Sequence, residues 1–414
     1  MKLVTLIVIG AGSRGTTYAR YATAFPEEAR VVGVAEPRDL YRNAMIQQHS
    51  IPSGHAFTDW REVAKVPKFA DAVIIATQDK MHAEPAMAFA NMGYHILLEK
   101  PMAPNPADCR RIVQAVKSNG VHMAVCHVMR YTGYTQKLKT MVDAGLIGDV
   151  VNIQSLEPVG FWHMAHSFVR GNWRNEAESG FMLLTKSCHD LDWIRYLMGV
   201  PCQAVSSFGS LKHFRKVEQP LGAADRCLDC QVEGQCPYSA RRIYLEALAR
   251  GHTGWPVDIL VANPTPEKVL EALRTGPYGR CVYACDNDVV DNQVVNFQFE
   301  GGRSASFTMM AFTEMGHRQT RIFGTRGQLT GDGQIISHYD FLTDQTEVID
   351  TAAADSSILG GHGGGDFGLM QRFIQALAKD DSSLILSGPD ASLESHLMVF
   401  GAEQARRHAT VVHL

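Results

Sequence analysis

The stretch LIVIGAGSRG, residues 6–15, decides the fold of this chain. An apolar run typical of a buried strand ends at Gly10, and Gly10, Gly12 and Gly15 follow the spacing G-x-G-x-x-G. The spacing alone is weakly specific, but between a strand and a helix it predicts a dinucleotide-binding turn. The first glycine permits the tight turn, the second lets the backbone approach a diphosphate, and the third lets helix and strand pack closely. The alternative is a glycine turn in an α/β domain that binds no nucleotide.

Neighbours of this turn predict how the cofactor is held. Ser13 and Arg14 open the following helix, whose first amides would carry the diphosphate. Glu36 ends the second predicted strand, 21 residues after Gly15, where a carboxylate can accept hydrogen bonds from the adenosine ribose. A carboxylate repels a 2′-phosphate, so NAD is favoured over NADP, although the nearby Arg38 works against this preference.

The distribution of strand and helix signals predicts two domains. Up to about residue 125 strands alternate with helices, which is typical of a parallel sheet covered on both faces. We therefore expect a doubly wound Rossmann domain at 1–128. From 129–414 strand-like segments become longer and Asn, Gly and Asp turns separate them, which predicts an α/β domain with a large, mostly antiparallel open sheet. A polar, cysteine-bearing insertion is expected at about 212–286.

Composition and charge narrow the class of protein. The chain has 414 residues, of which 45% are hydrophobic and 20% charged, as in ordinary globular proteins. The net charge is −4 and Lys and Arg form no block, so nucleic acid and anionic membranes are not expected as partners. The apolar run at the start is short and leads into the glycine turn instead of a cleavage site. We therefore expect a cytoplasmic protein with reduced thiols.

A lysine stands where another buried strand ends. The stretch HILLEKP, residues 95–101, passes from an apolar run to Glu99, Lys100 and Pro101. Ligands of open parallel sheets bind at the carboxyl ends of the strands, so Lys100 is expected to face the cofactor cleft. An ammonium there can stabilise the negative charge that develops on an alcohol oxygen as hydride leaves its carbon. Glu99 should bind cofactor or hold structure.

Several motifs together resemble one known family. GAGSRG, ILLEKP, MRYTGYTQKLKTMVDAGLIGDV and SGFMLLTKSCHDLDWIRYLMG are similar to the glucose–fructose oxidoreductase and inositol dehydrogenase (Gfo/Idh/MocA) family, and the likeness covers nearly the whole chain. The resemblance implies a Rossmann domain followed by an α/β domain with an open sheet, a nicotinamide cofactor, and sugar, inositol or related polyol substrates. It also implies a homo-oligomer, a dimer or tetramer formed through the open sheet.

The resemblance also implies roles for individual residues. It places Lys100 beside the nicotinamide and the reacting carbon, and it makes His189 the acid–base residue. If TKSCHDLD is helical, Thr185, His189 and Asp192 share one face, so Asp192 could orient the histidine. Many dehydrogenases of the family carry aspartate where this chain has Thr185, so either Asp190 or Asp192 substitutes for it or the proton follows a different path.

Further binding residues are expected around these centres. Cofactor contacts are expected from Thr77, His82, Glu99 and Lys100, and substrate contacts from Lys100, Arg130, Lys186 and His189. The stretch FWHMAHSFVRGNWRNEAESG, residues 161–180, is either a loop that covers the sheet edge or a substrate loop. In the second interpretation Trp173 stacks on a sugar ring, Arg170 or Arg174 holds an anionic group, and His163 contacts substrate.

The insertion contains a cysteine pattern typical of metal sites. RCLDCQVEGQC gives Cys227, Cys230 and Cys236, and Cys281 or Cys285 follows later. Two thiolates two residues apart form half of a tetrahedral site, so the pattern predicts a structural zinc ion held by the first three and by Cys281. The spacing fits an iron–sulfur cluster poorly, and plain reduced cysteines are the third interpretation. The remaining cysteines, at 109, 126, 188 and 202, read as core.

The sequence thus predicts an NAD-dependent oxidoreductase that moves a hydride between a secondary alcohol of a sugar, glycoside or inositol and the nicotinamide. A redox-neutral NAD-dependent glycosidase, acting by transient oxidation, elimination and re-reduction, is the alternative and could take an anionic glycoside. A non-catalytic dinucleotide sensor is a third hypothesis, against which the intact Lys100 and His189 count.

Overall fold

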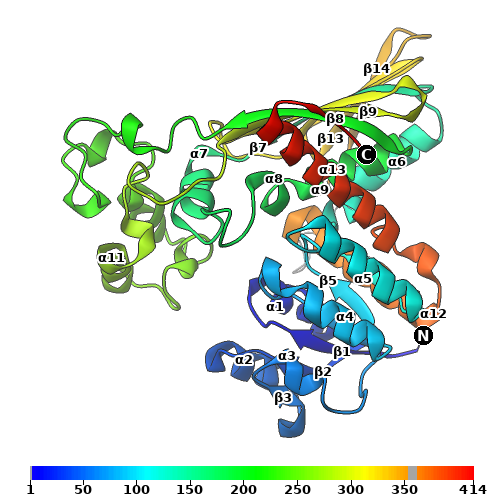
Figure 1. The fold of residues 1–414 in the computed structure, drawn as a ribbon, viewed down its shortest axis with the longest axis horizontal. Coiled ribbons are helices and arrows are strands. Elements are labelled where there is room, and N and C mark those ends of the chain that lie inside the picture. The colour runs from blue at the N-terminus through cyan, green and yellow to red at the C-terminus, as the bar shows by residue number, and fades with distance from the viewer. Residues whose placement is uncertain (1, 353–360) are drawn as a thin grey trace.

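The N-terminal part of the computed structural model is a Rossmann fold (Figure 1). The structure describes residues 2–352 and 361–414. Six parallel strands lie in the order β3-β2-β1-β4-β5-β6, the doubly wound arrangement. The strands are β1 (Val4–Ile9), β2 (Ala29–Ala35), β3 (Ala56–Phe57), β4 (Ala72–Ile75), β5 (His95–Leu98) and β6 (Met123–Val125). The helices are α1 (Ser13–Ala24), α2 (Asp39–His49), α3 (Trp60–Val63), α4 (Ala83–Asn91) and α5 (Pro106–Ser118).

Alternation along β1 explains how this sheet is covered on both faces. Leu6 and Val8 belong to one apolar cluster, whereas Ile7 and Ile9 belong to a second cluster on the other face. Successive side chains of a strand point to opposite faces of the sheet, so a continuous apolar run is typical of a strand that is buried on both faces. The carboxyl ends of β1, β4 and β5 therefore share the edge at which the glycine turn and Lys100 lie.

Within the described residues the second sheet has nine strands in the order β14-β13-β12-β11-β7-β10-β9-β8-β15, and among these pairs β10 and β7 alone are parallel. This confirms the large, mostly antiparallel sheet. Its strands are β7 (Val150–Pro158), β8 (Cys202–Ser210), β9 (Asn292–Phe299), β10 (Ser304–Met310), β11 (Gln319–Gly324), β12 (Gly327–Gly331), β13 (Ile335–Asp340), β14 (Gln345–Asp350) and β15 (Val411–His413). Its helices are α6 (Gly133–Asp143), α7 (Phe161–His163), α8 (Met182–Thr185), α9 (Cys188–Met198), α10 (Glu246–Ala249), α11 (Pro266–Thr275), α12 (Gly365–Lys379) and α13 (Pro389–His408).

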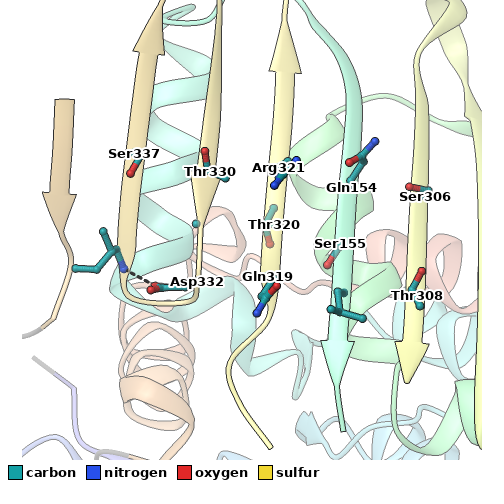
Figure 2. A pocket seen from close by; sticks show the side chains of 13 residues that line it. Gln154, Ser155, Ser306, Thr308, Gln319, Thr320, Arg321, Thr330, Asp332 and Ser337 are labelled. Carbon is teal, nitrogen blue, oxygen red and sulfur yellow. Dashed lines mark hydrogen bonds between the residues drawn. The ribbon is translucent and has the colours of Figure 1, made fainter. Parts of the chain in front are cut away.

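One face of this sheet is covered by helices and the other is open. Helix α9 packs against β7 and β10. Figure 2 shows the opposite face, where polar side chains of five neighbouring strands, among them Gln154, Thr308, Arg321 and Ser337, line a shallow hollow of about 680 Å³.

The C-terminal helices tie the two sheets together. Helix α12 packs against α1, and its residues Leu369 and Phe373 belong to a core cluster of the Rossmann sheet. Helix α13 contacts both β8 of the large sheet and α5 of the Rossmann domain (Figure 1). The chain between β8 and β9 forms a separate lobe of short helices that includes α11 (Figure 1). No helix within the described ranges is long and apolar enough to cross a bilayer.

Candidate active site

The glycine turn has the geometry that a dinucleotide needs. Gly10 has φ +89°, and a Cβ there would lie 2.6 Å from the carbonyl oxygen of Ala76. A Cβ on Gly15 would lie 2.0 Å from the carbonyl oxygen of Gly10, so neither position accepts a side chain. Helix α1, which begins at Ser13 after the N-cap Gly12, has no capping side chain and no acidic residue in its first turn. Its N-terminus can therefore receive a diphosphate, and the residues present fit NAD.

Glu36 lies at the edge of this turn as a charged, buried carboxylate. It is 1% exposed and accepts hydrogen bonds from the Ala11 amide (2.9 Å) and from Nε of Arg38 (2.7 Å). Burial alone would raise the pKa of Glu36, but the hydrogen bonds from Arg38 and Ala11 lower it. Arg38 is half exposed and lies over the ring of Tyr41. Ribose hydroxyls can replace the hydrogen bonds that Glu36 accepts from this half-exposed side chain, whereas a 2′-phosphate would be repelled by the carboxylate.

Arg14 and Glu99, both expected to contact cofactor, instead pair with each other. Arg14 donates from Nε to Glu99 Oε1 (2.6 Å) and from Nη1 to Asp366 of α12 (3.2 Å), and Tyr18 also donates to Glu99 (2.8 Å). Burial would raise the pKa of Glu99, but Arg14 and Lys100 lower it. For Glu99 the geometry favours the structural interpretation. The contact between Arg14 and Asp366 fastens α12 to the Rossmann domain.

The side chain of His82 connects two loops at the sheet edge. It is fully buried, with Nδ1 2.7 Å from the carbonyl oxygen of Pro101 and Nε2 3.1 Å from that of Thr77. Thr77 lies beside the glycine turn, since its amide nitrogen is 3.1 Å from the place of a Cβ on Gly10. His82 therefore positions the loops after β4 and β5, and Thr77 stands where a cofactor would pass.

Lys100 connects the two domains. It lies two residues after β5, its amide donates to Glu99 Oε2 (2.6 Å), and its Nζ donates to the carbonyl oxygen of Thr185 in α8 (2.7 Å). The Lys100–Pro101 peptide is cis. The half-buried ammonium is thus aimed from the cofactor domain toward the helix that precedes His189.

Sequence reasoning missed Asp79, which also belongs to this site. Burial raises the pKa of Asp79 and Glu99 adds to the rise, while His82, Lys100 and the indole N–H of Trp173 oppose it. Its Oδ2 is buried and has no hydrogen-bond partner among the described residues. An acid in the turn after the buried strand β4 was a usable signal, because that turn lies at the same sheet edge as Lys100.

His189 lies on the first turn of α9 and is 9% exposed, with its ring centroid 5.9 Å from that of His127. Asp192, predicted to orient it, instead forms two 2.7 Å hydrogen bonds with Arg130, from Nε and Nη2. Arg130, predicted to bind substrate, is 3% exposed and also donates to the carbonyl oxygen of Leu386. Arg130 and Asp192 therefore form a buried structural pair beneath the site.

A second charged network surrounds the sheet side of α9. Glu157 on β7 forms ion pairs with Lys186 (2.7 Å) and Arg318 (2.6 Å), and Arg318 donates a hydrogen bond to Asp190 (2.9 Å). Burial raises the pKa of Asp190, with Arg318 opposing. His163 joins this network, where burial, Lys186 and His166 lower its pKa to about 3, so that it is neutral at physiological pH.

The loop before α8 is divided between the site and the insertion. Trp173 is 40% exposed and reaches Asp79, and Lys80 donates to the carbonyl oxygen of Ala177, so the loop closes onto the Rossmann domain. The two arginines are not brought to Lys100. Arg174 binds Asp286 (3.0 and 3.1 Å), and Arg170 donates to the carbonyl oxygens of residues 280 and 238. Both tie the loop to the insertion.

The predicted zinc ion is not confirmed. In the described ranges no three His, Cys, Asp or Glu residues converge closely enough to hold a metal ion. The nine cysteines are all free thiols, and the four at 109, 126, 188 and 202 are buried, as expected of core residues.

A dinucleotide turn, and a lysine that reaches from the end of β5 to the helix preceding His189, define the class as a nicotinamide-dependent oxidoreductase fold. The chain belongs to the Gfo/Idh/MocA family: residues 4–127 match the oxidoreductase family's NAD-binding Rossmann fold, and residues 139–414 match its C-terminal alpha/beta domain.

Individual relatives are more distant. The chain is 25% identical over 362 residues to YteT of Bacillus subtilis, covering 83% of this chain and 80% of that protein. It is 27% identical over 214 residues to 2,7-anhydro-N-acetylneuraminate hydratase of Mediterraneibacter gnavus, covering 51% and 54%. Levoglucosan dehydrogenase, solved with NADH and levoglucosan, has a TM-score of 0.71 at 17% identity over 100% of this chain and 99% of that chain. At this identity the structural likeness shows the fold.

Proposed function

We propose that the protein is an NAD-dependent oxidoreductase that moves a hydride between a secondary alcohol of a sugar, glycoside or inositol and the nicotinamide. The observation that carries the proposal is Lys100, which extends from the end of β5 to the carbonyl oxygen of Thr185 and lies near the partly buried acid Asp79. A substrate hydroxyl that displaces the Thr185 carbonyl would meet an ammonium at the cofactor edge of the sheet.

NAD, when bound, supplies the hydride acceptor. The turn at Gly10, Gly12 and Ser13 and the carboxylate of Glu36 would hold the dinucleotide. Lys100 would stabilise the developing negative charge on the alcohol oxygen, and His189 would exchange the proton. Trp173, whose indole is partly exposed above Asp79, would cover the sugar ring and limit the access of water.

A redox-neutral reaction is the second candidate function. One of the relatives is a hydratase by name, and the site holds Asp79, a carboxyl whose pKa is raised by burial. A carboxyl in its protonated form could assist a leaving group or a water molecule, which net alcohol oxidation does not require. In that case an anionic glycoside remains a candidate substrate, although Arg170 and Arg174 are committed to other partners.

Substitution of Lys100 tests the proposal. Lys100→Met should lower kcat by roughly 10²- to 10⁴-fold and leave the Kd for NAD unchanged, because the amine acts at the alcohol oxygen. Lys117→Met is the matched control: Lys117 is exposed and pairs with Asp390 at the surface, so turnover should be preserved. Wild-type turnover in Lys100→Met would remove this residue from the mechanism.

A substrate panel separates the two reactions. Free sugars, inositols and chromogenic glycosides, including anionic ones, are incubated with substoichiometric NAD⁺. NADH that accumulates only up to the NAD⁺ supplied, with glycosides intact, supports net oxidation. Product far beyond the NAD⁺ supplied, without a rise in NADH absorbance, would establish the redox-neutral reaction.

We further infer that the chain forms a homo-oligomer, in which a second copy covers the open polar face of the large sheet. The uncovered hollow on β7, β10, β11, β12 and β13 supports this (Figure 2). Light scattering should give the mass of a dimer or tetramer. The substitution Thr330→Arg on this face should dissociate it, and an unchanged assembly would refute the proposed location of the subunit interface. The cytoplasmic location stays a prediction.

A further inference from the structure

Trp255, in the lobe between β8 and β9, is an exposed side chain that other rings hold in place. It is 45% exposed. The rings of Trp162, His163 and His166 contact it, with centroids 5.1, 5.0 and 5.5 Å from that of Trp255. Val257, two residues further on, is fully buried and anchors the backbone. An indole that is both exposed and supported in this way offers a preformed apolar surface to a ligand.

A continuous run of rings joins Trp255 to Trp173, the indole that we propose to cover the reacting sugar. The ring centroid of His163 lies 5.7 Å from that of Phe168, and the centroid of Phe168 lies 6.0 Å from that of Trp173. Phe168 is buried, whereas Trp173 is 40% exposed. The run therefore has an exposed tryptophan at each end, so two rings of one ligand could pack on it, one at each indole.

A paired set of charges lies between the reacting lysine and this run of rings. Lys100 donates to the carbonyl oxygen of Thr185, and the next residue, Lys186, pairs with Glu157 near the end of β7. Helix α7, which carries the first two of the rings that contact the exposed indole, begins four residues after Glu157. The aromatic surface therefore adjoins the proposed site for hydride transfer.

The loop between β10 and β11 extends the same surface. Its Thr313 carbonyl oxygen accepts a hydrogen bond from the amide of Phe161 (2.9 Å), which holds the loop against α7. The loop carries Met315, which is 44% exposed, and Arg318, which pairs with Glu157. Apolar groups thus stand beside cations that carboxylates already neutralise. Such a surface suits an uncharged ligand that combines C–H faces with hydroxyl groups, as a sugar ring does.

We propose that Trp255 and Trp162 form a second sugar-binding subsite, so that the substrate is a glycoside with at least two sugar rings. The inference rests on the proposed function, because the first ring is the one that Lys100 and Trp173 receive. The second ring would pack its C–H face on the Trp255 indole. The lobe between β8 and β9 would therefore select the length of the substrate without taking part in hydride transfer.

Calorimetric titration of the full chain in the presence of NADH, so that no alcohol is oxidised, tests the subsite. The probes are maltose, cellobiose and lactose, each compared with glucose and with the methyl glycoside of its own non-reducing sugar. At least one disaccharide should bind roughly 10-fold or more tightly than either of its single rings, because the second ring buries apolar surface on the indole. A panel in which no disaccharide binds more tightly than its single rings would overturn the proposal.

Variants locate the second ring. Trp255→Ala should remove most of the disaccharide preference and leave the Kd of the single rings unchanged. Phe341→Ala is the matched control: Phe341 is 52% exposed in the turn between β13 and β14, and every Kd should be preserved. Unchanged single-ring binding shows that a variant is folded, and if Trp255→Ala fails this criterion, Trp255→Gln replaces it with the same expected result. An undiminished disaccharide preference without the indole would overturn the subsite.

The subsite and the proposed function can fail separately. Turnover of free monosaccharides, with no disaccharide preference in the titrations, would refute the subsite and leave hydride transfer at Lys100 intact. A disaccharide preference that depends on Trp255, in protein that transfers no hydride, would refute the proposed function and leave the subsite in place.

Discussion

Replacing Asp192 with asparagine should lower the free energy of unfolding by roughly 3–5 kcal/mol. Asp192 and Arg130 are 1% and 3% exposed and share two hydrogen bonds of 2.7 Å. Asparagine keeps the shape of the side chain but leaves the guanidinium as an uncompensated buried charge. That charge, more than the loss of one hydrogen bond, sets the magnitude.

The ionisation of this pair is consistent with the expected loss. Burial would raise the pKa of Asp192, but Arg130 and His127 lower it. The contribution to stability is therefore fully present above the unfolded pKa of about 3.9 and is lost as the pH falls through the lowered folded pKa. At neutral pH the whole effect of the substitution should be visible.

Equilibrium urea unfolding followed by tryptophan fluorescence measures this effect, because Trp193 is adjacent to Asp192. Asp286→Asn is the control: Asp286 also binds an arginine, Arg174, but its side chain is 52% exposed, so at most about 1 kcal/mol should be lost. A loss below 1 kcal/mol in Asp192→Asn, accompanied by loss of turnover, would refute the structural assignment and favour a direct action on His189.

Two further predictions concern cofactor choice and acid stability. Glu36→Ser should narrow the preference for NAD over NADP in fluorescence titrations, because the carboxylate that repels the 2′-phosphate is gone. Equal affinities for NAD and NADP in the native protein would show that Arg38 overrides the effect of the Glu36 carboxylate. The pKa of His127 is lowered to about 3, chiefly by burial. Below about pH 6.5 the unfolded chain therefore binds a proton that the folded chain does not. His127 should therefore account for about 2 kcal/mol of the stability that is present at pH 7 and lost at pH 5. Urea unfolding at both pH values measures the free energy of unfolding that is lost between pH 7 and pH 5. This loss should be smaller in His127→Gln than in the native protein and unchanged in the exposed His408→Gln. Identical losses in all three proteins would contradict the prediction.

Local pattern was enough to predict the cofactor turn and both sheets. A side chain at Gly10 or Gly15 would clash with neighbouring backbone atoms, so the glycine spacing was sufficient to predict the turn. Lys100 was found because the end of a parallel strand determines where its next residues lie. The large sheet followed from strand-like segments separated by turn residues.

Partnerships between distant residues could not be predicted. Arg174 was expected to hold substrate because its neighbours suggested a binding loop, but its partner Asp286 lies far along the chain in the insertion. Asp192 and His189 share a helix face by periodicity, yet the carboxylate turns to Arg130 on another element. A charged side chain pairs with the partner that the tertiary fold brings near it, whereas helical periodicity predicts only the face of the helix on which the residue lies.

Label transfer tests the central claim, hydride transfer at Lys100, most directly. Sugars, glycosides and inositols deuterated at their carbinol carbons are incubated with NAD⁺ at enzyme-stoichiometric concentration, and the nicotinamide and the sugar are analysed by mass spectrometry. For at least one substrate the account predicts deuterium on the nicotinamide, either as NADH or after exchange back to NAD⁺, with the wild-type protein and not with Lys100→Met. Protein that binds NAD but transfers no deuterium from any of these substrate classes, or equal transfer by Lys100→Met, would contradict the account.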